Sequence, residues 1–397
     1  MTLLPRLSAA LLLASSLAAA QPPSLPSGLG GAPSLPSFGP PSTPLNSAPT
    51  DSASHASAVS GFAEWRSGLR LNSDPLQKRQ SINEVRLSLA LDYPFELGTA
   101  AVSSRLAGDL LIDSVDQRST VSLQSGSGPL DLREAWLGFS PLAALDLKVG
   151  RQPLTWGSGD LLFINDLFSK DWNSFFSGRD SEYLKAPSDA VKAALFLERI
   201  NIDLVWLPEF DADRYIDGRR ISYYDPASDA AAGRDRAFTA LQPDGDEWAV
   251  RAYQTVAGIE IAGYGYRGYW KSPTSFDPAA GLPSFGRLQV VGASLRGAVA
   301  GGIGNIELGY YDSLDDRAGD DPLHPNNQTR LLIGFEHEVA NQLTAGWQLY
   351  IERTEHYQGY RDGLADQRDA VAKRRTLMTN RLSYESHNQT VSWSLFS

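Results

Sequence analysis

Glu84-Val85-Arg86-Leu87-Ser88-Leu89-Ala90-Leu91-Asp92 is the stretch that decides the fold. Large aliphatic side chains occupy its odd-numbered positions, and polar or small side chains occupy the even-numbered ones. Successive side chains of a β-strand point to opposite faces, so this period of two predicts a strand with one apolar face and one polar face.

The same alternation recurs along the chain, for example over residues 145–149, 200–206, 330–336 and 343–352. Turn-forming residues separate the runs. About fifteen runs of this kind can be counted, near residues 61–71, 83–93, 100–113, 129–139, 144–155, 189–198, 200–208, 246–255, 258–270, 287–297, 303–312, 328–338, 342–353, 373–385 and 389–397.

The connections between the runs alternate in length. Short ones follow the even-numbered runs, and long ones, such as residues 157–188 and 208–245, follow the odd-numbered runs. A barrel that enters the outer membrane from the periplasm has short turns on that side and long loops outside. A soluble β-sandwich or propeller has no reason to sort its connections in this way. The pattern predicts an all-β, antiparallel transmembrane β-barrel over residues 61–397.

The count of fifteen raises a difficulty, because bacterial single-chain barrels have even numbers of strands. The last run ends at Val391, Trp393, Leu395, Phe396 and Ser397 in mid-pattern. An unclosed barrel would leave an unpaired strand edge in lipid. We therefore expect about 16 strands, in a range of 16–18, and a chain that is truncated at its C-terminal end.

The N-terminal region predicts export. Residues 1–20 combine the positive charge of Arg6, a short apolar stretch and an Ala-Ala-Ala cleavage site, as in a signal peptide. Residues 21–60 are rich in Pro, Ser, Gly and Ala, which predicts a disordered periplasmic arm. This arm is either a plain linker or a tether to peptidoglycan or a partner protein.

Composition excludes several classes of function. The net charge of -11, which becomes -12 without Arg6, argues against nucleic acid as a partner. The absence of cysteine excludes disulfides, thiolate metal sites and covalently attached c-type haem. None of the five histidines lies in a hydrolase or zinc-protease motif, so we expect no enzymatic activity, no metal site and no cofactor.

One segment carries a family resemblance. Residues 150–169 read GRQPLTWGSGDLLFINDLFS and lead from a strand through a glycine-rich turn into a long connection. This resembles a signature of porin-like outer-membrane barrels of Gram-negative bacteria, broadly similar to the alginate-export type. The resemblance implies that the connection folds back into the lumen and narrows it.

The residues of this connection support that expectation, because their side chains are too apolar for a loop left in water. The alternative is a loop packed on the barrel rim or against neighbouring protomers. The candidate constriction residues are Trp156, Asp160, Phe163, Asp166, Phe168 and Trp172.

The polar strand faces carry both signs of charge. Opposing acidic and basic rows would set a transverse field that orders polar solutes. Alternatively, the charges pair with one another and stiffen the wall, and the sequence leaves both interpretations open. The candidate pore-lining residues are Glu84, Arg86, Arg105, Asp109, Asp146, Lys148, Asp203, Arg251, Glu307, Arg330, Glu336, Glu352, Arg375 and Arg381.

The long connections are rich in aspartate, notably over residues 211–225 and 312–321. Such oxygen ligands could hold Ca²⁺, but their spacing matches no EF-hand loop. The sequence favours solvated acidic loops.

The sequence thus predicts a water-filled channel in the bacterial outer membrane for diffusion of a small polar or charged solute. Expected partners are membrane lipid, the solute and further copies in a homo-oligomer. The alternative hypothesis is a structural barrel that scaffolds a periplasmic partner through residues 21–60, such as an electron-transfer or export complex.

Overall fold

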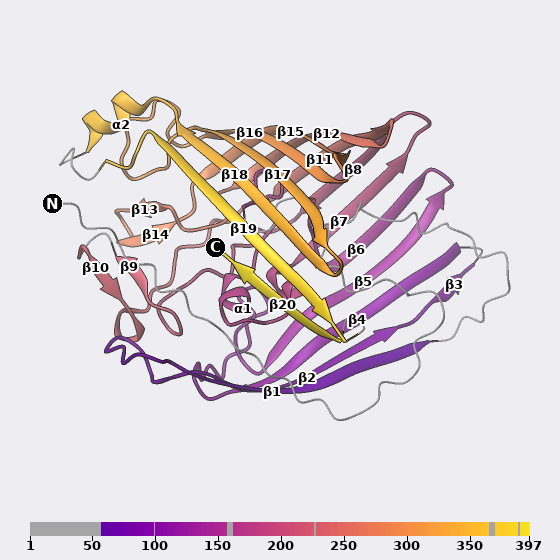
Figure 1. Cartoon of the computed structure of the whole chain (residues 1–397), viewed down its shortest axis with the longest axis horizontal. Helices are drawn as coiled ribbons and strands as arrows, with labels where there is room; N and C mark the ends of the chain where they lie inside the picture. The colour runs from indigo at the N-terminus through magenta and orange to yellow at the C-terminus, as the bar shows by residue number, and fades with distance from the viewer. Residues whose placement is uncertain (1–56, 99, 157–161, 226–227, 365–369, 388–389) are drawn as a thin grey trace.

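One antiparallel sheet of 16 strands dominates the computed structural model, which describes residues 57–98, 100–156, 162–225, 228–364, 370–387 and 390–397 (Figure 1). Each strand pairs with the next one along the chain, apart from the short strands of the loops. The strands of the sheet are β1 (Ala58–Leu69), β2 (Gln80–Asp92), β3 (Phe95–Leu97), β4 (Ala100–Asp113), β5 (Leu130–Leu142), β6 (Leu145–Pro153), β7 (Pro187–Phe196), β8 (Asn201–Leu207), β11 (Glu247–Val256), β12 (Ile259–Tyr269), β15 (Arg287–Val299), β16 (Gly302–Ser313), β17 (Gln328–Ala340), β18 (Leu343–Thr354), β19 (Arg374–Ser386) and β20 (Val391–Phe396).

The two ends of the sheet differ, as the alternation of connection lengths predicts. Tight turns join the strands at one end, whereas the opposite end carries long loops with small elements of their own (Figure 1). These elements are the hairpins β9–β10 (Tyr223–Asp225, Ala230–Ala232) and β13–β14 (Ser275–Asp277, Leu282–Ser284), the helices α1 (Trp172–Phe176) and α2 (Tyr357–Gly363), and the 3-10 turns η1 (Ser181–Leu184) and η2 (Arg234–Arg236).

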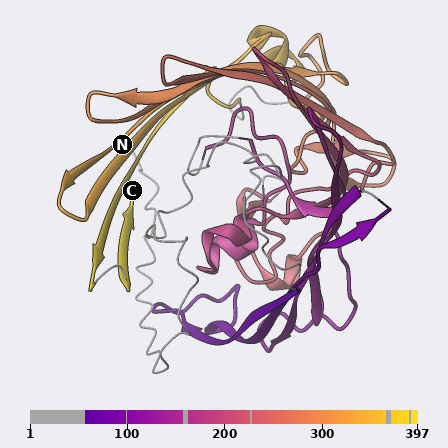
Figure 2. The same ribbon diagram turned by 90° about the vertical axis from the view of Figure 1, so that its right-hand side faces the viewer.

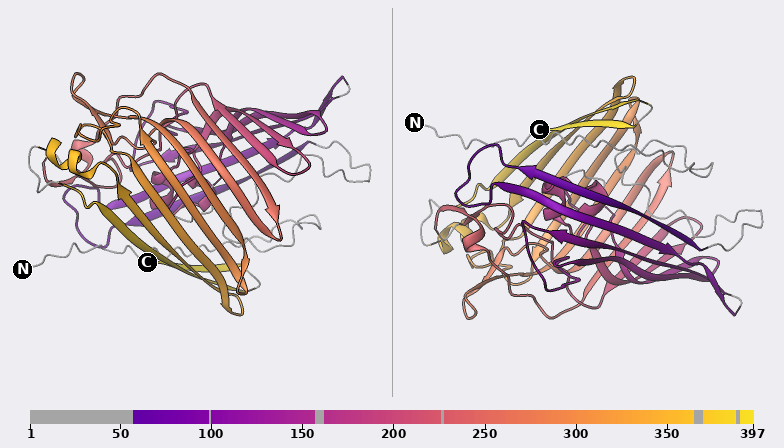
Figure 3. Two further views of the ribbon diagram at one scale, coloured as in Figure 1. Left: turned by 90° about the horizontal axis from the view of Figure 1, so that it is seen from above. Right: turned by 90° about the horizontal axis from the view of Figure 1, so that it is seen from below.

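The sheet is curled, and its inner face encloses α1 and the loops around it (Figure 2). Its strands run obliquely, as they must in a sheet that wraps towards a barrel (Figure 3). Among the described residues, β1 pairs with β2 alone and β20 with β19 alone. No helix in the described ranges is long and apolar enough to cross a membrane.

The wall has its polar face inside and its apolar face outside. On β2, Glu84 and Arg86 are 1% and 2% exposed, while Val85 and Leu87, which alternate with them, are 50% and 40% exposed. Most other strands repeat this arrangement, with exposed aliphatic side chains at alternate positions, whereas β7 has none and β20 is exposed on both faces. A surface of this kind is unfavourable in water and favourable in lipid, where every backbone polar group must be paired within the sheet.

The fifteen predicted runs coincide with the fifteen strands that follow one another across the sheet, and β3 is a short addition at the β2–β4 turn. The all-β antiparallel prediction of about 16 strands is confirmed. The predicted start at residue 61 was three residues late, because Ala58 already pairs with Asp92 in the β1–β2 ladder. The predicted signal peptide and nearly all of the predicted arm lie outside the described residues.

Candidate pore and crossing loop

The wall places the predicted pore-lining charges on its inner face, where they occupy the strand positions that alternate with the exposed aliphatic ones. Their burial differs. Fully or nearly fully buried are Glu84, Arg86, Asp109, Asp203, Arg251, Glu307 and Arg381. Half-buried are Arg105, Asp146, Lys148, Arg330, Glu336 and Glu352, and Arg375 is exposed.

Most of these charges pair with a neighbour of opposite sign on a nearby strand. Arg105 of β4, for example, bonds to Asp92 of β2 at 2.8 Å and to Glu134 of β5 at 2.9 Å. The same pattern joins Arg86 to Asp109, Arg251 to Glu260, Arg330 and Arg375 to Glu352, and Arg381 to Glu336. This geometry favours the interpretation in which paired charges stiffen the wall over segregated acidic and basic rows.

Lys148 and Asp203 have different surroundings. Lys148 is the register partner of Lys192 on β7, and its ammonium stacks 4.0 Å from the centroid of the Trp136 ring. Asp203 faces Arg251 across the β8–β11 ladder, yet neither of its buried carboxylate oxygens has a hydrogen-bond partner.

The long connection from β6 to β7 comprises residues 154–186, and its described parts, 154–156 and 162–186, lie within the curl of the sheet (Figure 2). We call it the crossing loop. Its first part packs into the protein core through Trp156, whose ring meets Phe168 edge-on with centroids 4.9 Å apart. Asp166 is buried. Its carboxylate accepts a 2.6 Å hydrogen bond from the Thr155 hydroxyl and forms a 2.9 Å ion pair with Lys170. The predicted candidate Asp160 lies outside the described residues.

The crossing loop reaches β15 and β16 through Ile164 and Asn165. Gly292 and Gly309 are register partners on these strands. A Cβ on Gly292 would lie 1.9 Å from Asn165 Oδ1, and a Cβ on Gly309 would lie 2.6 Å from Ile164 Cγ2. The glycine pair therefore leaves a notch in the wall for the loop. The Tyr311 hydroxyl closes the contact by donating to the Ile164 carbonyl oxygen at 2.5 Å.

The loop then returns to the opposite part of the sheet. Asp171 caps helix α1 by accepting a 2.8 Å hydrogen bond from the Ser174 N–H, and this short helix presents Trp172 beside Phe163, with ring centroids 6.1 Å apart. Beyond the helix, Arg179 bonds to Glu84 on β2 at 3.1 Å. The crossing loop therefore bridges β16 and β2.

A second segment that folds inward was missed by the sequence analysis. It is the connection between β8 and β11, described over residues 208–225 and 228–246, and we call it the capping loop. Its Arg214 is 5% exposed and bonds to Asp131 on β5 at 2.8 Å and to Asp171 on the crossing loop at 3.0 Å. Gly126 lies so close to this guanidinium that a Cβ there would be 2.2 Å from Arg214 Cζ. One arginine thus ties two loops to the wall.

The prediction that the acidic loops are solvated is wrong for Asp211, Asp213 and Asp316, which are buried, whereas the other aspartates named in these loops are partly or fully exposed. Asp211 and Asp213 are 7% and 8% exposed, because the capping loop packs against the crossing loop. Asp213 accepts hydrogen bonds from the Lys170 N–H at 2.8 Å and Trp172 Nε1 at 3.0 Å. In the loop between β16 and β17, Asp316 is also buried, and its carboxylate accepts hydrogen bonds from backbone N–H groups of its own turn. The sequence shows the aspartates but not that backbone donors converge on them.

Burial dominates the titration of these loop carboxyls. It raises the pKa of Asp213 above its ordinary value, and the hydrogen bonds from Lys170 and Trp172 offset that only in part. Burial also raises the pKa of Asp211, against the charge of Lys271. In the described ranges, no group of three or more Asp, Glu or His side chains is arranged to hold a metal ion.

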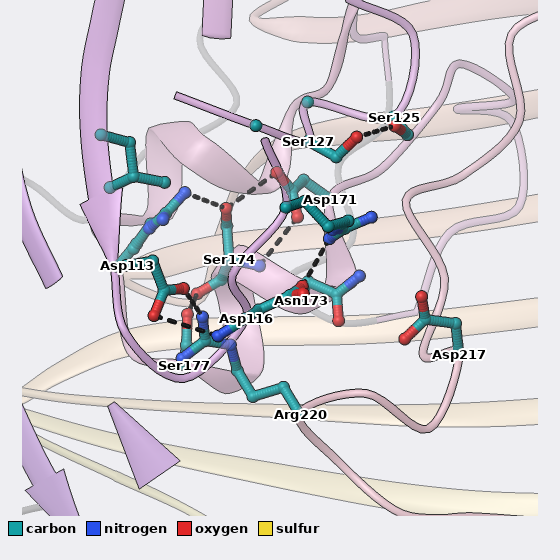
Figure 4. A pocket seen from close by; sticks show the side chains of 15 residues that line it. Asp113, Asp116, Ser125, Ser127, Asp171, Asn173, Ser174, Ser177, Asp217 and Arg220 are labelled. Carbon is teal, nitrogen blue, oxygen red and sulfur yellow. Dashed lines mark hydrogen bonds and ion pairs between the residues drawn. The ribbon is translucent and has the colours of Figure 1, made fainter. Parts of the chain in front are cut away.

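A polar pocket of about 80 Å³ lies where the two loops meet the wall (Figure 4). Asp113 and Arg220 border it from β4 and the capping loop, and Asp171, Ser174 and Ser177 border it from the crossing loop. Arg220 pairs with Asp113 there. The pocket marks water-accessible space between the loops and β4.

No protein-family model and no curated protein matches this chain. Solved structures that resemble it include OmpF of Salmonella typhi in a complex with daunomycin (8% identity, 83% of this chain and 85% of that chain, TM-score 0.43). Others are a loop L8 deletion mutant of OmpT from Vibrio cholerae (10%, 86% and 95%, 0.45) and the outer-membrane channel DcaP of Acinetobacter baumannii (10%, 86% and 89%, 0.44).

The pairing of consecutive strands and the outward apolar face define the class by themselves, which is an all-β antiparallel protein of the transmembrane β-barrel type. The resemblance to the alginate-export type stays a prediction.

Proposed function

We propose that this protein is a channel of the bacterial outer membrane through which a small polar or charged solute diffuses, with the crossing loop as its constriction. The observation that carries the proposal is the distribution of side chains on the two faces of the sheet. Buried charges such as Glu84 on the inner face alternate with exposed aliphatic side chains such as Val85 on the outer face. An inner face lined by charge suits a water-filled lumen, and an outer face of this kind suits lipid.

The loops narrow the lumen in this proposal. The crossing loop bridges β16 and β2, and Arg214 holds the capping loop against it. A solute would pass beside these loops, along a wall whose charges are mostly paired. Paired charges weaken any net field, so selection would depend mainly on size and on local hydrogen bonding.

The remaining parts of the proposal concern the rest of the chain. Residues 1–20 would direct export through the inner membrane and be removed. The predicted arm, which would end before Ala58 because β1 begins there, would remain in the periplasm, and copies of the chain would associate in the membrane. No contact of the described residues favours the scaffold hypothesis specifically.

Reconstitution in planar lipid bilayers tests the channel. We expect stepwise single-channel conductance in salt solution, and a complete lack of conductance at any voltage would remove the proposal.

A matched pair of substitutions on β2 tests the orientation of the wall separately. Leu87→Lys places a charge on the outer face and should reduce folding into lipid vesicles, at a cost of about 2–4 kcal/mol if the position lies near the bilayer midplane. Ser88→Lys places the same charge on the inner face and should fold normally. Equal effects of the two substitutions would contradict an outer face in lipid.

A further inference from the structure

A furrow of about 370 Å³ runs along the outer face of β12, β15, β16, β17 and β18, towards the end of the sheet that carries the tight turns. Its sides are apolar. They are formed chiefly by Leu295, Val299, Ile306, Ile333, Phe335 and Trp347. Four of these, Leu295, Val299, Ile306 and Trp347, are between 39% and 55% exposed.

The floor of the furrow is a pair of glycines. Gly297 on β15 and Gly304 on β16 are register partners, and they occupy outward positions in line with Leu295 and Ile306. Two neighbouring strands therefore lack a side chain at the same level, while the strands around them carry large ones. The furrow is a consequence of this pair rather than of a break in the sheet, since the β15–β16 ladder continues through it.

Aromatic residues in its lining indicate the depth of the furrow in the membrane. At the level of the glycine pair, Phe335 of β17 is the register partner of Gly304 and of Trp347 on β18, and the Phe335 and Trp347 ring centroids are 6.4 Å apart. Aromatic side chains at the end of an apolar band mark the level of the lipid headgroups. From there the furrow extends past Ile333 and Ile306 towards the middle of the wall.

We propose that this furrow is a binding site for one acyl chain of a phospholipid in the turn-side leaflet. The inference rests on the membrane location proposed above and goes beyond the channel function. Hydrocarbon can fill a narrow apolar furrow that starts at the headgroup level, whereas an unfilled one forfeits dispersion contacts along its whole lining. A flexible chain also follows the curvature of the wall.

A second copy of this protein fits the furrow less well. The sheet curls so that its outer face is convex (Figure 2). Two convex walls meet along their most prominent side chains, so the depression above Gly297 and Gly304 would stay empty between them. A stable protein interface also needs roughly 20–30 residues on each side, well matched in shape.

Gly304→Leu tests the site because it fills the furrow. The nearest obstacle to its Cβ is a methyl group of Val299, at 2.7 Å, which can rotate away. Gly263→Leu is the matched control: it adds the same side chain to an exposed position of β12 outside the furrow, where a Cβ meets nothing within 4 Å.

The full chain and both variants are folded into vesicles of phosphatidylethanolamine and phosphatidylglycerol, extracted in mild detergent and measured by native mass spectrometry. We expect one retained phospholipid on the unchanged protein and on Gly263→Leu, and a drop of about tenfold in occupancy, equivalent to about 1.4 kcal/mol, on Gly304→Leu.

Equal occupancy on all three proteins, or no retained lipid on any, overturns the acyl-chain site. Loss of an oligomer rather than of lipid in Gly304→Leu assigns the furrow to a second copy and also overturns it. Bilayer conductance of the same samples reports on the channel independently, so failure of the proposed function is distinguishable from failure of this site.

Discussion

Asn165 of the crossing loop donates two hydrogen bonds to the carboxylate of Glu307 on β16, from its backbone N–H at 3.2 Å and from its side-chain amide at 3.1 Å. The two residues are 142 positions apart in the chain, and both are nearly inaccessible to solvent. The same amide also donates to the Ala293 carbonyl oxygen of β15. One residue thus fastens the loop to two strands of the wall.

Glu307→Ala should release this end of the crossing loop. A hydrogen bond to a charged group contributes about 1.5–3 kcal/mol, and the substitution removes two of them. The expected result is a higher single-channel conductance and faster proteolysis within the loop. Glu307→Gln keeps an acceptor of similar shape and should show a smaller increase. Unchanged conductance in Glu307→Ala would mean that the loop does not limit the pore.

Gly309→Val should have a similar effect by a different cause. A Cβ at this position lies 2.6 Å from Ile164 Cγ2, so the new side chain occupies the notch that receives the loop. We expect displacement of the loop and increased conductance, with the barrel itself still folded by circular dichroism. Gly263→Val on the outer face is the control, because a Cβ there meets nothing. A loop that remains as protected as in the unchanged protein would argue against the notch.

These two contacts show what the sequence could and could not predict. The period of two identified all strands of the sheet except the three-residue β3, because it depends only on neighbouring residues. The apolar content of the loop predicted burial, and Trp156 and Phe168 are indeed buried. The notch was not predictable, since it requires Gly292 and Gly309 to be brought opposite each other by the β15–β16 register.

The capping loop was missed for a related reason. Its aspartates and arginines looked like a solvated surface, and in isolation Arg214 has no distinguishing neighbour in the sequence. Its partners Asp131 and Asp171 are 83 and 43 residues away, on a strand and on another loop. Only the tertiary structure turns such residues into a buried cluster.

Arg214→Met should detach the capping loop from the crossing loop. The side chains are similar in length, but the substitution removes the cation that the buried carboxylates of Asp131 and Asp171 share and leaves Asp131 only its 4.0 Å contact with Arg133, at a cost of about 3–5 kcal/mol. We expect a larger conductance and increased hydrogen exchange in residues 208–246.

Arg219→Met is the control for that substitution. Arg219 lies in the same loop but pairs with the nearby Asp217 and is half-buried. A partly solvated pair contributes about 0–1 kcal/mol, so this variant should behave like the unchanged protein. If both variants open the channel equally, the loss of positive charge rather than the buried cluster is responsible.

The raised pKa of Asp213 predicts an effect of pH on the same contact. Because burial raises the pKa of this carboxyl in the docked loop, its protonated form is favoured there, and docking gains free energy as the pH falls. That gain is complete below the ordinary value of 3.8 and is lost as the pH rises through the raised one. Conductance should therefore decrease on acidification towards about pH 4.

Asp213→Asn separates this carboxyl from the other acidic groups. The amide cannot ionise, so the variant should keep a tightly docked capping loop at neutral pH and show a smaller change in conductance between about pH 7 and pH 4. Asp235→Asn, at an exposed position of the same loop, should retain the full change. Asp211 also has a raised pKa, so some pH dependence should remain in Asp213→Asn. A pH response as large in Asp213→Asn as in Asp235→Asn would show that docking does not depend on protonation of Asp213.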